Sequence, residues 1–366
     1  MRVLLTGGAT GGHIYPALAL GRYIRKEDPT AELQFVGAKG GLEEKIIPQA
    51  GFILETLEVK GFPRRFTPAL FKSCFLLGRA ALHASRILRT FKPDVIIGTG
   101  GFAAAPVVMA GLVHRKRVIL HEQNVLPGLA NRVFAPWVYG VCLSYEASKD
   151  YFRRSSNLYL TGNPRASEME EVEKDSARNL LGLDPELPLV LAVGGSGGAE
   201  KLNQCMLDFL FLSAGNKNLQ VLYVTGEKYY EQVISRLAKG KIIENYGGRL
   251  QVRAYQQEIP LAISAADLMI TRAGATTLAE LTALGRAAIV VPSPNVVHNH
   301  QLLNAQELFN HGAVSLIEEG GLSGQVLQDE VYRILYNSSL LEQMSQISKS
   351  LGCTDAASNI YKLFLS

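Results

Sequence analysis

The chain of 366 residues contains only four cysteines and one tryptophan, and it has no long hydrophobic stretch. The cysteines are scattered and form no CxxC pair, which argues against a zinc or dithiol motif and predicts reduced thiols in a cytoplasmic protein. The longest uncharged apolar run, residues 102–113, is too short to cross a bilayer. Paired carboxylates of the DxD kind are missing, so we expect no metal cofactor.

Acidic residues are absent from one long segment of the chain. None occurs between Glu58 and Asp94, and residues 1–163 have a net charge of +10, against −6 for residues 164–366. This split predicts two halves with different partners, one of them anionic, although two surfaces can also differ in charge by chance. Nucleic acid is not favoured, because no aromatic stacking platform or recognition-helix pattern accompanies the basic residues.

The chain does contain a repeated unit of apolar strand, glycine-containing turn and helix. It occurs in the first half at "RVLLTGG", "LQFVGAKGG" and "DVIIGTGG", and it restarts after residue 188 with "LVLAVGGSGG". Val/Ile/Leu-rich runs that alternate with helical segments are typical of parallel strands buried on both faces. The pattern predicts an α/β protein with two doubly wound, Rossmann-like domains, residues 1–163 and 164–344, that bind ligands at the carboxyl ends of their strands.

The first glycine loop, "GGATGGHIYP", connects a strand to a helix. Glycine permits a close approach to the backbone, and the N–H groups of a first helical turn suit an anion or the oxygens of a sugar. No GK[ST] follows, so the loop is not a P-loop, and its glycines are paired as GGxxGG rather than spaced as GxGxxG. The alternative is a tight strand-to-helix turn without a ligand.

The loop "GTGGFA" formally satisfies a dinucleotide fingerprint. Gly98, Gly100 and Ala103 fit GxGxxA, and Glu122 follows at a suitable distance for a ribose contact. Two observations argue against a dinucleotide-dependent oxidoreductase. The loop belongs to the third unit, whereas the fingerprint normally opens the domain, and Glu122 lies within "HEQN" rather than at a bare strand end.

Two loops of the second half offer groups that suit a nucleotide. Ser196 of "GGSGGA" can bond a phosphate or carbonyl oxygen, and in "RAGATTLAEL" the residues Ala275, Thr276 and Thr277 offer donors for a diphosphate at a helix start. Glu280 follows Thr276 by four residues, so it lies on the same helical face, where a carboxylate can accept two hydrogen bonds from a ribose diol. The alternative for Glu280 is an ordinary solvated helix residue.

Seven segments, in chain order, resemble the MurG family: "GGATGGHIYP", "GTGGFAAAP", "HEQNVLPGLANR", "TGNPRASE", "GGSGGA", "RAGATTLAEL" and "HNHQLLNA". This family moves N-acetylglucosamine from UDP-N-acetylglucosamine to lipid I, an undecaprenyl-linked muramoyl peptide, at the cytoplasmic face of the inner membrane during peptidoglycan synthesis. The resemblance spans nearly the whole chain. It implies a GT-B fold with an amino-terminal acceptor domain, a carboxyl-terminal donor domain and a last helix, about residues 345–366, that packs back on the first domain.

The resemblance also implies residue roles, carried over position by position. In the first half, the resemblance assigns contacts with the donor sugar to Thr10, Gly11, Gly12 and Asn124. In the second half, it assigns Ser196 to the nucleotide, the main chain of Gln256 to the uracil and Gln301 to the sugar hydroxyls. The phosphates and the ribose are assigned to Ala275, Thr276, Thr277 and Glu280. Three positions depart from the family pattern. Gly197 replaces the glutamine of GGSQGA, Phe102 replaces an aromatic hydroxyl, and Arg165, our candidate for the diphosphate, stands one place before the arginine of GNPxR.

His13 is the candidate base for the family reaction, which inverts the anomeric centre as the 4-hydroxyl of muramic acid attacks and UDP leaves. The attacking hydroxyl needs a proton acceptor. His13 ends the glycine loop at a helix N-terminus, where the helix dipole disfavours the imidazolium and keeps the ring neutral. The alternative is that His13 only orients a phosphate or the loop.

Residues 68–92 read as one long helix inside the segment without acidic residues. Basic residues recur along it every seven positions, and apolar residues cluster at its start, which suits an anionic membrane surface. The alternative is a helix that covers the sheet and turns a solvated basic face outward. We expect peripheral docking on phospholipid through Arg64, Arg65, Leu70, Phe71, Lys72, Phe75 and Arg79.

Two rival functions share the predicted fold. A UDP-N-acetylglucosamine 2-epimerase would use the same nucleotide site but would need a buried acid/base set and no membrane patch. A non-catalytic nucleotide-sugar-binding subunit would lack His13 or Asn124, and both are present. Release of UDP that depends on the acceptor distinguishes a transferase from either rival.

Overall fold

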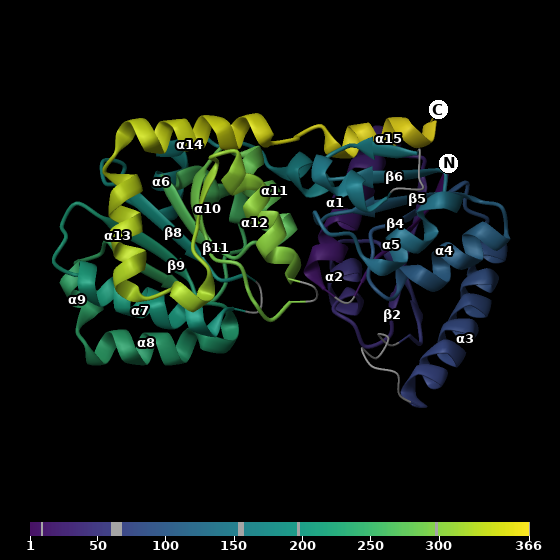
Figure 1. Ribbon diagram of the computed structural model, residues 1–366, viewed down its shortest axis with the longest axis horizontal. Helices are drawn as coiled ribbons and strands as arrows, with labels where there is room; N and C mark the ends of the chain where they lie inside the picture. Colours follow the sequence, from purple (N-terminus) through teal and green to yellow (C-terminus); the bar gives the residue numbers. More distant parts are fainter. Residues whose placement is uncertain (9, 60–67, 153–156, 196–197, 297–298, 366) are drawn as a thin grey trace. The chain divides into compact units, whose positions relative to one another are not determined.

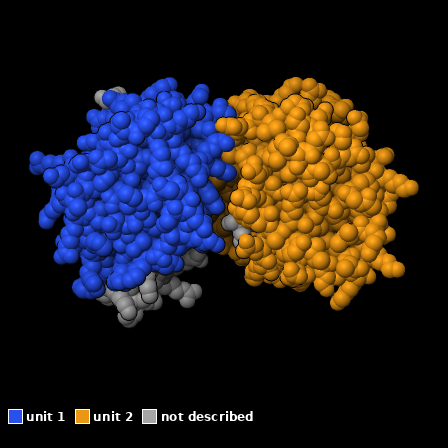
Figure 2. Space-filling model, turned by 180° about the vertical axis from the view of Figure 1, so that it is seen from behind, with its two compact units in different colours: residues 1–168, 353–366 blue, residues 169–352 orange. Residues whose placement is uncertain are grey.

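The computed structural model divides into two compact units. Unit 1 comprises residues 1–168 and 353–366, and unit 2 comprises residues 169–352 (Figures 1 and 2). The structure describes residues 1–8, 10–59, 68–152, 157–195, 198–296 and 299–365, with the backbone alone over 68–74. Each unit is an α/β sandwich around its own parallel sheet.

Unit 1 contains a seven-stranded parallel sheet in the order β3-β2-β1-β4-β5-β6-β7. Its strands are β1 (Arg2–Thr6), β2 (Glu32–Ala38), β3 (Ile53–Leu57), β4 (Val95–Gly98), β5 (Arg117–Glu122), β6 (Gly140–Leu143) and β7 (Leu158–Leu160). Its α-helices are α1 (Gly11–Glu27), α2 (Glu43–Gln49), α3 (Pro68–Phe91), α4 (Ala104–Val113), α5 (Leu129–Phe134) and α15 (Ala356–Leu365). Short 3₁₀ turns are η1 (Ala135–Trp137), η2 (Glu146–Tyr151) and η3 (Pro164–Glu168).

Both faces of this sheet are covered, which explains why its central strands are continuously apolar. In β1, Val3 and Leu5 belong to a core formed with α1 and α15, whereas Leu4 belongs to a core formed with α3 and α4. Successive side chains of a strand point to opposite faces, so a strand buried on both faces cannot alternate with polar residues. Helices α3 and α4 lie side by side on the second face (Figure 1).

Unit 2 contains a six-stranded parallel sheet in the order β10-β9-β8-β11-β12-β13. Its strands are β8 (Leu189–Val193), β9 (Gln220–Val224), β10 (Leu250–Arg253), β11 (Leu268–Thr271), β12 (Ala287–Val290) and β13 (Val314–Leu316). Its α-helices are α6 (Lys174–Leu181), α7 (Glu200–Ser213), α8 (Tyr230–Lys239), α9 (Ile242–Tyr246), α10 (Ile259–Ala265), α11 (Ala275–Ala283), α12 (His300–Asn310), α13 (Gly324–Leu335) and α14 (Ser338–Leu351). The 3₁₀ turns are η4 (Glu227–Tyr229) and η6 (Glu319–Gly321).

The strand order of each sheet reverses beside its first strand. In unit 1 the reversal lies between β1 and β4, and in unit 2 between β8 and β11. Doubly wound sheets bind ligands at this switch point, outside the carboxyl ends of the strands. The predicted architecture of two doubly wound α/β domains is therefore confirmed.

The boundaries between the units differ from the predicted ones. The prediction ended the first domain at residue 163, whereas η3 belongs to unit 1, because Glu168 pairs with Arg22 at 2.8 Å and the Ser167 hydroxyl accepts the N–H of Ala357 at 3.0 Å. The prediction also returned residues from about 345 onward to the first domain. Helix α14 instead packs on α11 and β12 in unit 2, and only residues 353–366 join unit 1.

Candidate active site

The candidate residues of unit 1 lie where three neighbouring strands end. The first glycine loop follows β1, the second follows β4, and Gln123 and Asn124 follow β5. Segments that lie between 24 positions (Thr99 and Gln123) and 110 positions (His13 and Gln123) apart in the sequence thus meet at the switch point of the sheet.

The two glycine loops pack directly against each other. A Cβ atom added at Gly7 would lie 1.9 Å from the hydroxyl oxygen of Thr99, and one added at Gly101 (φ +80°) would lie 2.4 Å from the carbonyl oxygen of Gly8. No side chain fits at those distances, so these glycines are needed for loop packing. Gly12 is exposed, and an added Cβ there would meet nothing closer than 3.8 Å. The tight-turn alternative therefore explains the first glycine pair. At the second pair Gly12 is open, whereas a Cβ added at Gly11 would lie 3.1 Å from the Tyr15 ring.

Helix α1 begins at this second pair. Thr10 precedes it as an exposed N-cap whose side chain makes no capping hydrogen bond, while its carbonyl accepts the N–H groups of His13 and Ile14 at 3.1 and 3.2 Å. The N–H groups of Gly11 and Gly12 belong to the first turn, where a helix provides no backbone partner. Thr10 and Gly12 are thus exposed with the half-buried Gly11 between them, at a helix start whose N–H donors have no helical partner.

Glu43 is a buried carboxylate that sequence analysis missed. It is fully buried at the start of α2, and its Oε1 accepts the N–H of Ala38 at 2.7 Å. Cβ atoms added at Gly8, Gly37 or Gly41 would lie between 2.1 and 2.5 Å from Glu43 side-chain atoms. The carboxylate therefore fills the space that three glycines leave. The glycine pair before "LE" was the available signal, but it does not reveal that Gly8 is a neighbour.

The His13 ring is held from its Nδ1 side. Nδ1 lies 2.9 Å from the carbonyl oxygen of Thr99 and 3.2 Å from Oε1 of Gln123. Both neighbours are acceptors, so Nδ1 must be the protonated nitrogen and the neutral ring has its lone pair on Nε2. An added Cβ at Gly100 (φ +98°) would lie 2.9 Å from Nδ1, which explains the glycine at that position.

A second histidine lies behind Gln123. His121 is fully buried, and its Nε2 lies 3.0 Å from the carbonyl oxygen of Gly162 while its Nδ1 lies 3.0 Å from Nε2 of Gln123. Burial lowers the pKa of His121 to about 4, the bond to Gly162 opposes this shift in part, and the charge of His13 adds to it. His121 is therefore neutral at physiological pH.

Glu122 is committed to hydrogen bonds inside unit 1. It is buried, its Oε1 accepts the N–H of Asn124 at 3.0 Å, and its Oε2 accepts the N–H of Gly128 at 2.9 Å and Nδ2 of Asn131 at 2.8 Å. A ribose cannot replace these bonds without unfolding the loop. The interpretation of the second glycine loop as a dinucleotide site, with Glu122 on the ribose, is therefore wrong. Glu122 instead positions Asn124, whose carbonyl also accepts the hydroxyl of Ser148 at 3.0 Å.

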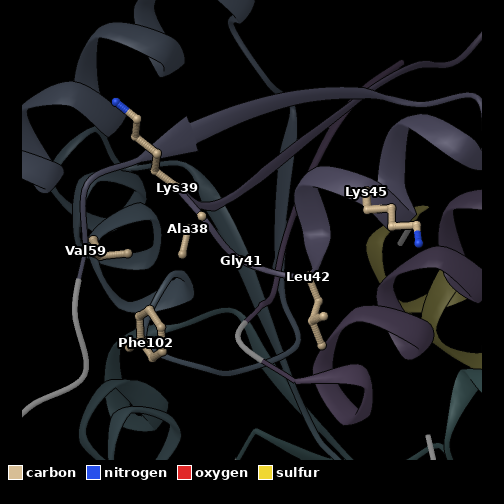
Figure 3. Close-up of a pocket in the computed structure, with 8 residues that line it drawn as sticks. Ala38, Lys39, Gly41, Leu42, Lys45, Val59 and Phe102 are labelled. Atoms are coloured by element: carbon tan, nitrogen blue, oxygen red, sulfur yellow. The ribbon is translucent and has the colours of Figure 1, made fainter. Parts of the chain in front are cut away.

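A cavity of about 420 Å³ lies beside these loops in unit 1 (Figure 3). Phe102 of the second glycine loop and Val59 lie on one side of it, and Lys45 of α2 lies on the other. The cavity thus combines an apolar wall with nearby positive charge. Its lining residues are Ala38, Lys39, Gly40, Gly41, Leu42, Lys45, Val59 and Phe102.

The candidate residues of unit 2 lie at the start of α11, directly after β11. Gly274 caps this helix without a side chain. The hydroxyl oxygen of Thr276 is buried and has no hydrogen-bond partner among the described residues, which is costly for a polar atom. Glu280 is only 8% exposed, so it is not a solvated helix residue. Ala275 and Thr277 belong to the same first turn.

Two glutamines of unit 2 hold neighbouring loops. The buried Gln256 accepts Nη1 of Arg253 at 2.6 Å and donates to the carbonyl of Glu258 at 3.1 Å, which fixes the main chain of its loop. Gln301 accepts the N–H of Ser293 at 2.8 Å. Ser196 lies outside the described residues.

Arg165 is paired inside unit 1. Its Nη1 donates to Glu168 at 2.5 Å, and its guanidinium carbon lies 5.8 Å from the ring centre of Tyr15. Glu168 also pairs with Arg22, so one carboxylate serves two guanidinium groups, and the diphosphate role of Arg165 stays a prediction. In unit 2, Arg272 is likewise bound, by Glu319 and by the carbonyl of Val291.

The predicted long helix is α3. Ala80, Ala84 and Leu88 pack on the sheet, while Phe75 is 66% exposed and Arg79 is exposed as well. Arg64, Arg65 and the side chains of Leu70, Phe71 and Lys72 lie outside the described residues. Within the described part of the chain, no helix is both long and apolar enough to cross a membrane.

The described residues also contain no group of three or more His, Cys, Asp or Glu side chains placed to hold a metal ion.

Comparisons with known proteins match both units. Residues 3–142 match the glycosyltransferase family 28 N-terminal domain, and residues 189–360 match the C-terminal domain of the same family. A relative from Caldanaerobacter subterraneus subsp. tengcongensis, named UDP-N-acetylglucosamine--N-acetylmuramyl-(pentapeptide) pyrophosphoryl-undecaprenol N-acetylglucosamine transferase, is 40% identical over 99% of this chain and 99% of its own length. A relative of the same name from Bacillus cytotoxicus is 38% identical over 99% of this chain and 98% of its own.

Solved structures share the fold. The crystal structure of Acinetobacter baumannii MurG has a TM-score of 0.78 at 24% identity and covers 100% of this chain and 99% of its own. A putative UDP-N-acetylglucosamine 2-epimerase from Listeria monocytogenes has a TM-score of 0.71 at 14% identity, covering 98% of this chain and 94% of its own. These likenesses define a class, the GT-B proteins.

The relatives then define the family: the chain belongs to glycosyltransferase family 28 and, within it, to the MurG transferases. The resemblance and the GT-B fold predicted from the sequence are confirmed.

Proposed function

We propose that this chain transfers N-acetylglucosamine from UDP-N-acetylglucosamine to the 4-hydroxyl of the muramyl unit of lipid I, giving lipid II for peptidoglycan synthesis. Full-length similarity to transferases of that name supports the substrates. The observation that supports the chemistry is the His13 ring, whose Nδ1 donates to Thr99 and whose Nε2 is left as the acceptor.

The donor binds to unit 2 in this proposal. The first-turn N–H groups of α11 and the unpartnered hydroxyl of Thr276 face the diphosphate, and the buried carboxylate of Glu280 accepts the ribose hydroxyls. The leaving UDP gains negative charge, which N–H donors at a helix N-terminus stabilise. We therefore propose that no metal is needed, and that a chelator leaves turnover unchanged.

The acceptor binds to unit 1. His13 takes the proton of the attacking hydroxyl on Nε2 while the bond from the sugar to UDP breaks. The cavity beside the glycine loops has Phe102 on one wall and Lys39 and Lys45 among its lining residues, and we propose that it receives part of the lipid-linked acceptor. Lys39 also pairs with Glu58 at 3.6 Å.

Replacing His13 tests the proposal. In His13→Ala, kcat should fall by about 10²- to 10⁴-fold, the range for loss of a general base, with the KM for UDP-N-acetylglucosamine nearly unchanged. The assay follows UDP release with a soluble lipid I analogue, and His114→Ala is the control because His114 follows α4 away from the loops. Near-normal turnover of His13→Ala would remove the base assignment.

We also propose that α3 docks the protein on anionic phospholipid at the cytoplasmic face of the inner membrane. The exposed Phe75 and Arg79 support this, since an apolar side chain beside a basic one suits a charged headgroup layer. Phe75→Asp should reduce binding to vesicles that contain anionic lipid. Leu180→Asp is the control, because Leu180 is 72% exposed in unit 2. Equal binding of the chain to neutral and anionic vesicles would contradict the proposal.

A further inference from the structure

The candidate base and the two side chains behind it form one hydrogen-bonded chain that ends on the backbone. It runs from His13 Nδ1 to Gln123 Oε1 (3.2 Å), from Gln123 Nε2 to His121 Nδ1 (3.0 Å), and from His121 Nε2 to the carbonyl oxygen of Gly162 (3.0 Å). Gln123 and His121 are both almost completely buried, at 1% and 0% exposure.

The direction of every hydrogen in this chain follows from its ends. The carbonyl of Gly162 can only accept, so His121 carries its proton on Nε2 and its Nδ1 is an acceptor. That acceptor requires a donor, which places the amide nitrogen of Gln123 toward His121 and its oxygen toward His13. The same amide nitrogen also donates to the carbonyl of Thr99 at 2.7 Å, so the amide has no second favourable orientation.

We propose that Gln123, oriented by the buried His121, is a positioning residue that acts together with the Thr99 carbonyl to fix the Nδ1–H tautomer of His13 and to aim its Nε2 at the acceptor hydroxyl. This inference rests on the proposed role of His13 as the base. It assigns to Gln123 a function that the resemblance did not give it. A neutral amide performs here the task that a carboxylate performs in a Ser-His-Asp triad, without adding a negative charge.

A neutral support has a chemical consequence. A carboxylate beside Nδ1 would stabilise the imidazolium, which is the form of the ring that cannot accept a proton. An amide orients the ring but stabilises its charged form less. Two other titratable groups lie near this hydrogen-bonded chain, and neither places a negative charge beside His13 Nδ1. Cys142, which pairs with His121 across β5 and β6, is buried, and burial raises its pKa to about 12. The carboxylate of Glu122 is bonded to Asn131.

The tautomers can be read directly by ¹⁵N NMR of the ring nitrogens in the full-length protein. At pH 7.5 the His13 ring should show a protonated Nδ1 and an unprotonated Nε2, and the His121 ring should show the opposite pattern. His13→Ala assigns the first set of signals. Observation of the Nε2–H tautomer at His13 would overturn the inference, whatever the activity of the protein.

Gln123→Met keeps the length of the side chain but removes its hydrogen bonds to His13, His121 and Thr99, which leaves the Thr99 carbonyl as the one remaining partner of His13 Nδ1 among the described contacts of that atom. We expect kcat to fall about tenfold or more, with the KM for UDP-N-acetylglucosamine within twofold, and the His13 signals to show exchange between tautomers. Gln49→Met, at the exposed end of α2, is the matched control and should change neither. If Gln123 had only a structural role, Gln123→Met would lower the amount of folded protein, which is measured by thermal unfolding and by the binding of UDP to unit 2. The His13 tautomer in the protein that remains folded would then be unchanged.

The inference and the proposed function fail differently. If Gln123→Met keeps the single Nδ1–H tautomer and its kcat stays within twofold of the wild type, Gln123 does not position the ring. If His13→Ala retains turnover while the tautomers are as expected, the base assignment is wrong and the relay has only a structural role.

Discussion

Lowering the pH from 7.5 to 5 should weaken unit 1 through His121. In the folded chain the pKa of this buried ring is lowered to about 4, whereas in the unfolded chain it returns to about 6.5. Below pH 6.5 the His121 ring therefore binds a proton in the unfolded chain, whereas in the folded chain it binds this proton only near pH 4. The stability that comes from the neutral ring is complete above pH 6.5 and is lost as the pH falls toward 4.

The size of this effect follows from the same two values. At about 1.4 kcal/mol for each pH unit, the full loss is about 3 kcal/mol, of which about 2 kcal/mol is lost by pH 5. His121→Gln keeps a donor for the Gly162 carbonyl but does not titrate in this range. We expect it to be less stable than the wild type at pH 7.5, and this difference should shrink by about 2 kcal/mol at pH 5.

Urea unfolding at the two pH values measures the effect. The single tryptophan, Trp137, lies in η1 of unit 1, so its fluorescence follows the unfolding of that unit. His83→Gln is the matched control, because His83 is exposed on α3 and its loss should leave the pH dependence unchanged. An equal fall in stability for the wild type and His121→Gln between pH 7.5 and 5 would refute the reasoning.

Two further predictions concern the glycine loops and the donor site. Gly101→Ala should destabilise unit 1 by about 2 kcal/mol or more in urea unfolding and abolish turnover. The reason is that φ at Gly101 is +80° and that the new methyl group would lie 2.4 Å from the carbonyl oxygen of Gly8. The control is Gly78→Ala on α3, which should be tolerated because a Cβ added there meets nothing within 4 Å. Thr276→Val removes a buried hydroxyl that has no partner among the described residues, so the protein without UDP should be as stable as the wild type or about 1 kcal/mol more stable. Calorimetry should nevertheless show that the variant binds UDP more weakly. Thr282→Val, whose hydroxyl already bonds the Leu278 carbonyl in the same helix, should cost stability and leave UDP binding unchanged.

The fold could be predicted because the strands are buried on both faces. A strand such as residues 189–193 has no polar residue to place on either side, so its sequence alone indicates a parallel sheet covered by helices. The end of a domain is less visible. Nothing local in residues 164–168 shows that they pack on α1 and α15, because those contacts join segments more than 140 positions apart.

The site was predicted in part, for a physical reason. A glycine shows that something approaches the backbone, but not what approaches it. At Gly7 and Gly101 the neighbour is the other loop, and at Gly8 it is the carboxylate of Glu43. Long-range neighbours of this kind also explain why the hydrogen-bonded chain from His13 through Gln123 was not found. His13 lies in α1 after β1, whereas His121 lies in β5 and Gln123 directly follows it, and these two segments meet only in the folded sheet.

The central claim is that this chain moves a sugar from a uridine donor to a lipid-linked acceptor. Mass spectrometry of the products formed from UDP-N-acetylglucosamine and a lipid I analogue tests it most directly. We expect the acceptor to become heavier by one N-acetylhexosamine residue, with one UDP released for each, in buffer that contains a chelator. Isomerisation of the donor sugar with no change in the mass of the acceptor would rule out this transfer.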